Sequence, residues 1–120
     1  MGNMGPGTAD VEPLGDALWS LGLGGEHDLS TLPLVDAAFQ QISQSGTTVV
    51  VDVCDATFID STIISAIVKQ TRRGEMLLLV VPERGPVRRA LDLVGVSAAV
   101  RVFESREDAL RAVPAKDDPS

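Results

Sequence analysis

Cysteine and aromatic residues are nearly absent from this chain of 120 residues, which has one cysteine, one tryptophan, three phenylalanines and no tyrosine. A single cysteine excludes an internal disulfide, so we expect a protein of the reducing cytoplasm. The lack of a row of aromatic side chains argues against stacking on single-stranded nucleic acid. No apolar run approaches the roughly 18 residues that a membrane helix needs.

Basic residues are also scarce, since 10 lysines and arginines stand against 17 acids and leave a formal net charge of -7. Such a charge repels phosphate backbones and anionic lipids, so neither nucleic acid nor a membrane is an expected partner. The length and the 44% hydrophobic content predict one globular domain with an aliphatic core. We expect residues 1–8 to be a flexible leader, residues 9–113 the domain and residues 114–120 a flexible tail.

Apolar and β-branched runs alternate with segments of helical periodicity along the domain. Strands are predicted at residues 9–11, 17–23, 47–54, 76–81 and 100–103. Helices are predicted at residues 32–43, 61–73 and 86–94 and from residue 106 onward. Their predicted buried faces include Leu34, Val94 and the pair Ile63 and Ile67. Glycines are predicted to end the second strand, Gly74 to end the second helix, and residues 55–60 to form a turn. This alternation predicts an α/β fold, in which a mixed, mostly parallel sheet is packed with about four helices.

Polar residues cluster after the most apolar strand, at 47–54, where the carboxyl ends of strands and the helix N-termini after them gather ligands and modifications. Ser61 is predicted to open a helix, where free N–H groups and the helix dipole favour an anion such as a phosphate. The residue pattern is also compatible with Asp60 or Ser61 as a plain N-cap. Asp28 lies in the turn-like segment before the first helix, where it is compatible with a cap of that helix.

Two catalytic alternatives find little support in the sequence. A hydrolase built on Ser61 would need His27 as base and Asp52 or Asp55 to orient it, but the chain has one histidine and no G-x-S-x-G motif. A receiver-like domain that accepts phosphate on Asp52 or Asp55 lacks the usual acidic pair and the later lysine. We therefore predict that the protein is not an enzyme.

Cofactor and metal sites are not predicted either. The glycines at 22, 24 and 25 do not form a G-x-G-x-x-G or P-loop motif. Cys54, His27 and the aspartates lack the spacing of a metal site, and Cys54 is predicted to be a small buried hydrophobe on its strand.

Three segments in fixed order resemble the STAS family, in particular its anti-sigma-factor antagonist branch. They are Gly25-Glu26-His27-Asp28-Leu29, then VVVDV, then Thr57-Phe58-Ile59-Asp60-Ser61. The resemblance covers about residues 16–113 and implies a regulatory module without a catalytic centre. It implies a partner that is both an anti-sigma factor and a serine kinase, and a phosphatase that reverses the phosphorylation.

The resemblance also implies roles for individual residues. Ser61 matches the phosphorylated serine of the family, whose unphosphorylated form sequesters the anti-sigma factor. Asp28 matches the aspartate of the family's Gly-Glu-Leu-Asp segment and is expected at the same partner-facing end as Ser61. The expected partner-binding residues are Asp28, Asp60, Ser61, Thr62 and Ile63, and we expect the helix N-terminus to accommodate the phosphate with little refolding.

The chain departs from the family after Ser61, where it has Thr62-Ile63-Ile64 in place of the common Ser-Gly-Leu. Ile63 puts a β-branched side chain where a partner backbone would approach closely. Three alternatives remain: a divergent partner, Thr62 as the phosphate acceptor, or a STAS scaffold outside any phosphorylation cycle. His27 stands in place of the usual leucine and is predicted to be a neutral substitution in an exposed loop, with pH sensing as the alternative.

Overall fold

The computed structural model describes residues 6–42, 46–73 and 76–114, and within these ranges it contains six strands and four α-helices. The strands are β1 (Thr8–Gly15), β2 (Leu18–His27), β3 (Thr48–Asp52), β4 (Ala56–Ile59), β5 (Met76–Val80) and β6 (Arg101–Phe103). The α-helices are α1 (Leu32–Ile42), α2 (Ser61–Lys69), α3 (Pro86–Leu93) and α4 (Arg106–Arg111). Three 3-10 turns complete them: η1 (Leu29–Thr31), η2 (Gln70–Arg73) and η3 (Val96–Ala98).

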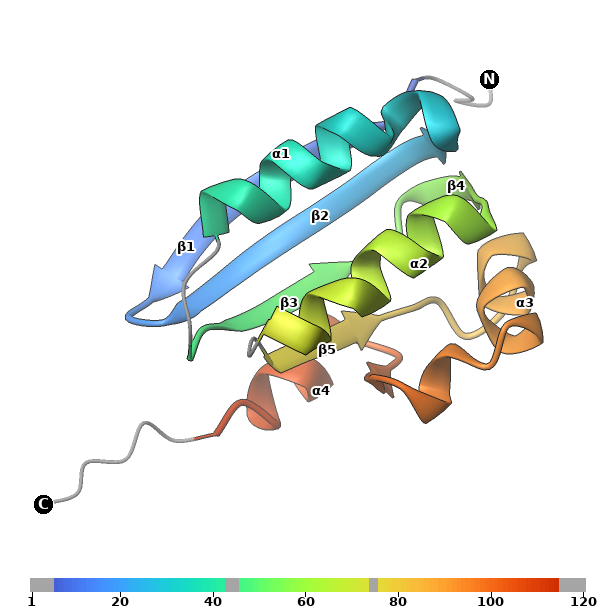
Figure 1. Cartoon of the computed structure of the whole chain (residues 1–120). Helices are drawn as coiled ribbons and strands as arrows, with labels where there is room; N and C mark the ends of the chain where they lie inside the picture. The colour runs from blue at the N-terminus through green and yellow to red at the C-terminus, as the bar shows by residue number, and fades with distance from the viewer. Residues whose placement is uncertain (1–5, 43–45, 74–75, 115–120) are drawn as a thin grey trace, which may run out of the picture.

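The sheet is mixed and mostly parallel, which confirms the predicted fold class. Its order is β1-β2-β3-β5-β6, with β1 antiparallel to β2 and the remaining neighbours parallel. β4 lies off this path and pairs in parallel with the last residues of β2. β2 therefore has two parallel partners: its first half pairs with β3 and its second half pairs with β4 (Figure 1).

The prediction that glycines end the second strand near residue 23 was wrong, because β2 continues to His27. Gly24 lies close to β1, where an added Cβ would come 3.1 Å from the Thr8 hydroxyl oxygen. Gly25 has a φ of 75° and lies at a register shift between β2 and β4. These glycines thus permit a close strand approach and a bulge within the strand.

The segment after β3 also differs from the prediction. Residues 55–60 were expected to form a turn, but Ala56–Ile59 form β4. The turn is confined to residues around Cys54 and Asp55, where the Gly25 N–H donates to the Asp55 carbonyl at 3.1 Å. This hydrogen bond attaches the segment between β3 and β4 to β2. The residues of β4 can then pair with the second half of β2, which β3 leaves unpaired.

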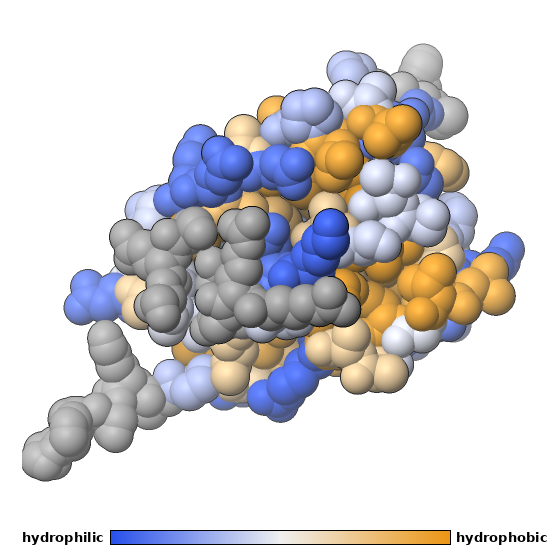
Figure 2. Space-filling view, in the orientation of Figure 1, coloured by the Kyte–Doolittle hydropathy of each residue, from blue (hydrophilic) through white to orange (hydrophobic). Residues whose placement is uncertain are grey.

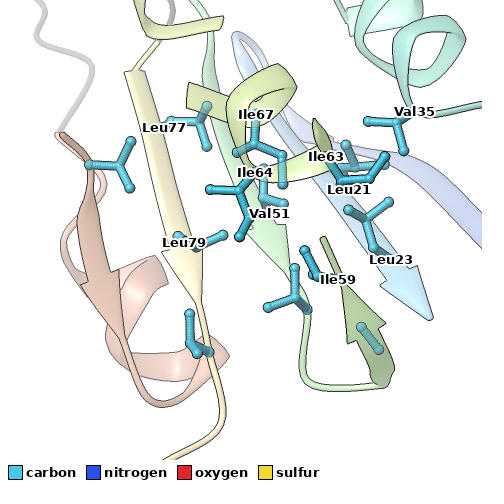
Figure 3. Close-up of a cluster of buried hydrophobic side chains, with 14 of the residues drawn as sticks. Leu21, Leu23, Val35, Val51, Ile59, Ile63, Ile64, Ile67, Leu77 and Leu79 are labelled. Atoms are coloured by element: carbon cyan, nitrogen blue, oxygen red, sulfur yellow. The ribbon is translucent and has the colours of Figure 1, made fainter. Parts of the chain in front are cut away.

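β3 is covered on both faces, as its uninterrupted apolar run predicts. Val49, Val50 and Val51 have no exposed surface. Val49 and Val51 belong to the larger core under α1, α2 and α3, while Val50 belongs to a smaller core with Ala109 of α4. Figure 3 shows the larger core, in which side chains of α2 meet those of β2, β3 and β5.

Several predicted positions shift within these elements. Leu34 and Val94, predicted on buried helix faces, are exposed because α1 buries Phe39 instead and α3 ends at Leu93. The predicted helix 61–73 is α-helical to Lys69 and then tightens into η2. Ser43 and Gly74, predicted as the ends of two helices, lie outside the described residues, as do residues 1–5 and 115–120.

The end of the predicted leader packs against the domain. β1 begins at Thr8, and Pro6 forms a parallel bridge with Glu26. An added Cβ on Gly7 would lie 2.5 Å from the Glu26 carbonyl oxygen and 2.7 Å from Cε1 of His27. The boundary predicted at residue 9 therefore falls inside β1, and Gly7 permits the chain to cover the His27 ring.

We predict that Gly7→Ala lowers the free energy of unfolding by about 1–3 kcal/mol, because the new methyl group has no space against the Glu26 backbone. Gly22→Ala is the control, since nothing lies within 4 Å of a Cβ at that position. Urea unfolding of both variants measures the difference. Equal stability of the two variants would contradict the close packing over His27.

Candidate functional site

The parallel pairing of β2 and β4 brings the two predicted site segments together. His27 is aligned with Ile59, and the Asp60 N–H donates to the His27 carbonyl at 3.2 Å. Asp28 and Asp60, the residues that follow the two strands, therefore lie side by side at one edge of the sheet. α1 and α2 both start from this edge (Figure 1). Ser61 and residues 28–31, here called the Asp28 loop, therefore form one surface.

Asp60 is the N-cap of α2. Its Oδ1 accepts from the N–H groups of Thr62 at 3.0 Å and of Ile63 at 3.2 Å. Ser61, the first helical residue, is exposed. The expectation that these N–H groups would receive a phosphate needs correction, because two of them already bond to Asp60. A phosphate on Ser61 would lie outside the cap and beside a carboxylate.

Asp28 also has a structural role, as the cap of η1. Its Oδ1 accepts from the Ser30 N–H at 2.9 Å and from the Ser30 hydroxyl. The bond from the Ser30 hydroxyl, followed by the bond from the Ser30 backbone, lowers the pKa of the Asp28 carboxyl. Asp28 therefore keeps its negative charge over the physiological range, at the same edge as Asp60.

Ile63 does not belong to the surface, contrary to its place among the expected partner-binding residues. Its side chain is 0% exposed and points into the core, toward the side chains of Leu21 and Val35 (Figure 3). A β-branched residue at this position therefore presents no obstacle to a partner's backbone. Thr62 is half-buried beside it and lines a groove of about 630 Å³ between α1 and α2.

Two exposed apolar residues at this edge were missed by the sequence analysis. Leu29, next to Asp28, is 65% exposed, and Phe58, which is aligned with Glu26 across the β2–β4 pair, is 49% exposed. The sequence signal for Phe58 was its position in a short β-branched segment, which was interpreted as a turn. Apolar surface lies over this end of the molecule and over α3 (Figure 2). Exposed apolar side chains beside polar ones are typical of an interaction site.

His27 is a buried residue of β2, so its prediction as an exposed loop residue was wrong. Its side chain is 0% exposed. Nε2 lies 3.1 Å from the Thr8 carbonyl oxygen and 3.0 Å from that of Gly24, while Nδ1 lies 2.9 Å from the Thr31 hydroxyl. The ring thus connects β1, β2 and η1 directly beneath the Asp28 loop.

Cys54 is exposed in the turn after β3, so its prediction as a buried hydrophobe was also wrong. Its backbone N–H donates to Asp52 Oδ1 at 2.9 Å. Partial desolvation of the thiol, and then the hydrogen bond and charge of Asp52 and the charge of Asp55, raise the pKa of Cys54 to about 11.

In the described ranges, no group of three histidine, cysteine or acidic residues is arranged to hold a metal ion. Within the same residues, no helix has the length and apolar character to cross a membrane.

Comparison with known proteins identifies the family. The STAS domain model matches residues 20–109, and the chain belongs to the STAS domain family. This membership decides against the receiver-like alternative. No curated protein matches the chain.

Solved structures share the fold. An anti-sigma factor antagonist from Mycobacterium paratuberculosis superposes with a TM-score of 0.77 at 23% identity, covering 90% of this chain and 94% of the other. The anti-sigma factor antagonist SpoIIAA in its unphosphorylated form gives 0.67 at 18% identity, covering 89% and 99%. The phosphorylated form of SpoIIAA, a Bacillus cell fate determinant, gives 0.56 at 16% identity, covering 89% and 100%. The chain therefore has the fold of anti-sigma-factor antagonists.

We predict that Asp60→Ala lowers the free energy of unfolding by about 0.5–2 kcal/mol, because the N–H groups of Thr62 and Ile63 lose their acceptor. Asp60→Asn keeps an acceptor oxygen and should retain most of this stability. Chemical unfolding of the two variants beside wild type measures the effect. A stable Asp60→Ala protein would show that the cap contributes little.

We predict that iodoacetamide alkylates Cys54 at least about 10-fold more slowly than free cysteine at pH 7.5, because a raised pKa keeps the exposed thiol protonated. The rate should continue to rise with pH up to about pH 11. Asp55→Asn removes one nearby charge and should shift this profile to lower pH. A rate that levels off near pH 8.5 would contradict the raised pKa.

Proposed function

We propose that this protein is an anti-sigma-factor antagonist, which binds an anti-sigma factor with serine kinase activity through the edge formed by Asp28 and Ser61. One observation carries the proposal: the exposed Ser61 lies at the start of α2, at the same edge as the Asp28 loop. The exposed side chains of Leu29 and Phe58 supply apolar contact area beside it. In this role the protein is a cytoplasmic binding module and not an enzyme.

The charge of this edge supports a switch at Ser61. Asp28 and Asp60 already place two carboxylates there, and β2, η1, β4 and α1 contain no lysine or arginine. A phosphate adds about -1.5 to -2 charges, which these elements do not neutralise. The added charge therefore acts on the partner, whose surface fits a neutral hydroxyl between two carboxylates, and the complex dissociates. A phosphatase restores the binding form.

Burial of Ile63 supports retaining the phosphorylation cycle in spite of the departure after Ser61. The side chain that replaces the common glycine is inside the core, and the hydroxyl of Ser61 remains exposed above it. Thr62 is the alternative acceptor, but it is half-buried and its N–H is held by Asp60. Ser61 is therefore the better substrate of the two.

A constitutive STAS scaffold is the second candidate function. The Asp60 cap favours the scaffold, because the N–H groups of Thr62 and Ile63, which would stabilise a phosphate on Ser61, already donate to Asp60. A scaffold would use the same edge for binding, without any change at Ser61. The two candidates differ in whether charge at Ser61 changes affinity.

We predict that Ser61→Asp weakens binding to the anti-sigma factor at least about 10-fold, because a new charge meets a partner surface fitted to a hydroxyl. The factor is first captured from lysate of the source cells with wild-type bait and identified as a kinase-like anti-sigma factor. Isothermal titration calorimetry then compares wild type, Ser61→Asp and Ser61→Ala. Ser61→Ala should bind within about threefold of wild type, since it adds no charge.

Ser65→Asp is the matched control, because Ser65 is exposed one turn further along the same face of α2. It should weaken binding much less than Ser61→Asp does. Mass spectrometry of wild type incubated with the captured kinase and ATP should find phosphate on Ser61. Equal affinity of wild type and Ser61→Asp, with Ser61 unmodified, would establish the scaffold. Failure to retain any anti-sigma factor would overturn the proposed function.

A further inference from the structure

The His27 ring occupies a closed pocket in which each nitrogen faces a defined partner. Nε2 faces two carbonyl oxygens, those of Thr8 and Gly24. A carbonyl oxygen only accepts, so Nε2 must carry a proton whatever the charge of the ring. Nδ1 faces the Thr31 hydroxyl, which both donates and accepts. The charge of the ring therefore depends on Nδ1 alone.

The Thr31 hydroxyl lies within hydrogen-bond distance of two groups but has one proton to donate. Its oxygen is 2.9 Å from His27 Nδ1 and 3.1 Å from the Asp28 carbonyl oxygen. When the ring is neutral, Nδ1 has no proton and the hydroxyl donates to it. When the ring takes a proton from solvent, Nδ1 donates to the hydroxyl oxygen, and the hydroxyl turns to donate to Asp28. Both charge states are thus hydrogen-bonded without a change of fold.

The charged residues on β1, β2 and α1, and directly after β2 and β4, are acidic. They are Asp10 and Glu12 of β1, Glu26 of β2, Asp36 of α1, Asp28, and Asp60 after β4. Asp28 directly follows His27 in the chain. On the side of Thr8 and Gly24, a pocket is lined by Asp52, Asp55 and one cation, Arg106 of α4. Acidic side chains outnumber this arginine, so a proton on His27 is attracted to the acidic edge.

We propose that protonation of His27 tightens the Asp28 loop and thereby strengthens partner binding. The Asp28 carbonyl already accepts from the Thr31 N–H at 3.0 Å, and in the protonated state the Thr31 hydroxyl donates to it as well. Residues 28–31 are then held more firmly in the conformation of the cap. A loop that is already ordered loses less conformational entropy when a partner binds. The His27 carbonyl also accepts from Asp60, so the same residue is attached to the segment that carries Ser61. The effect on affinity rests on the proposed function, whereas the effect on the loop does not.

The loop is tested first, on the full chain without a partner. Amide and imidazole nitrogen resonances are followed by NMR from pH 5 to 8, the range in which histidines commonly titrate. In wild type, the amides of Ser30 and Thr31 should shift with the same midpoint as Nδ1, and Nε2 should remain protonated. In Thr31→Val the ring should titrate while these amides no longer follow it. Thr31→Ser keeps the hydroxyl and should restore the coupling.

His27→Gln supplies an uncharged side chain that can both donate and accept, and its loop amides should not titrate. Amide spectra and urea unfolding verify that each variant is folded. A folded wild type in which Nδ1 titrates without the loop amides, or does not titrate between pH 5 and 8, would overturn the inference. A Thr31→Val protein that keeps the coupled shift would overturn the relay through the hydroxyl.

Binding is tested second, with the captured anti-sigma factor at pH 5.5 and pH 8. The ratio of the two affinities should be about fivefold larger for wild type than for His27→Gln, with tighter wild-type binding at pH 5.5. The comparison with His27→Gln cancels titration of the partner itself. Equal ratios for the two proteins would overturn the link to affinity. Absence of binding at both pH values would overturn the proposed function, and the loop titration would still decide whether His27 acts on the loop.

Discussion

The hydrogen bond from the Asp60 N–H to the His27 carbonyl is the contact on which the functional edge depends. It closes the parallel pairing of β4 with the end of β2, and it joins the two segments at the point where each leaves its strand. The pairing requires a β2 long enough to serve two neighbours and a chain that crosses from β3 to β4 at Cys54 and Asp55. The bulge at Gly25 belongs to the same arrangement. The position of Ser61 is thus a consequence of sheet geometry and not of helix formation alone.

The residues at this edge combine structural roles with the binding role that we propose for them. Asp28 and Asp60 each cap the turn or helix that follows them, so their carboxylates are held in place before any partner arrives. The cap of α2 is already occupied by Asp60, and β2, η1, β4 and α1 carry no lysine or arginine. In the switch that we propose, a phosphate on Ser61 therefore gains little inside the fold, and its energetic effect falls on the complex. A phosphate that acts on the complex and leaves the fold unchanged suits a switch that changes binding without changing structure.

The fold class followed from the sequence, because the β-branched run at 47–54 and the helical periodicities around it are strong local signals. The extent of β2 and the existence of β4 did not, because glycine-rich and short polar segments resemble turns until their pairing partner is known. His27 was misjudged for the same reason. Its polar neighbours suggested a loop, whereas Gly7 and Thr8, nearly 20 positions earlier in the chain, cover it.

The candidate site was predictable to a similar degree. Ser61 was indicated by its place at a predicted helix start, and the resemblance supplied the roles of Ser61 and Asp28. Their proximity follows from parallel strands having their carboxyl ends at one edge. The burial of Ile63 depends on which face of α2 meets the sheet, and its spacing with Ile67 indicated that face. The exposure of Phe58 depends on strand register, which local sequence does not determine. That of Leu29 depends on the turn η1, which begins at this residue.

Amide chemical-shift mapping of the labelled full chain against the captured anti-sigma factor tests the central claim most directly. The account predicts that perturbations concentrate on residues 28–31 and 58–62, because these segments form one edge. Smaller changes should reach the adjoining start of the groove between α1 and α2. Perturbations confined to β6 and α4, with residues 28–31 and 58–62 unchanged, would contradict it.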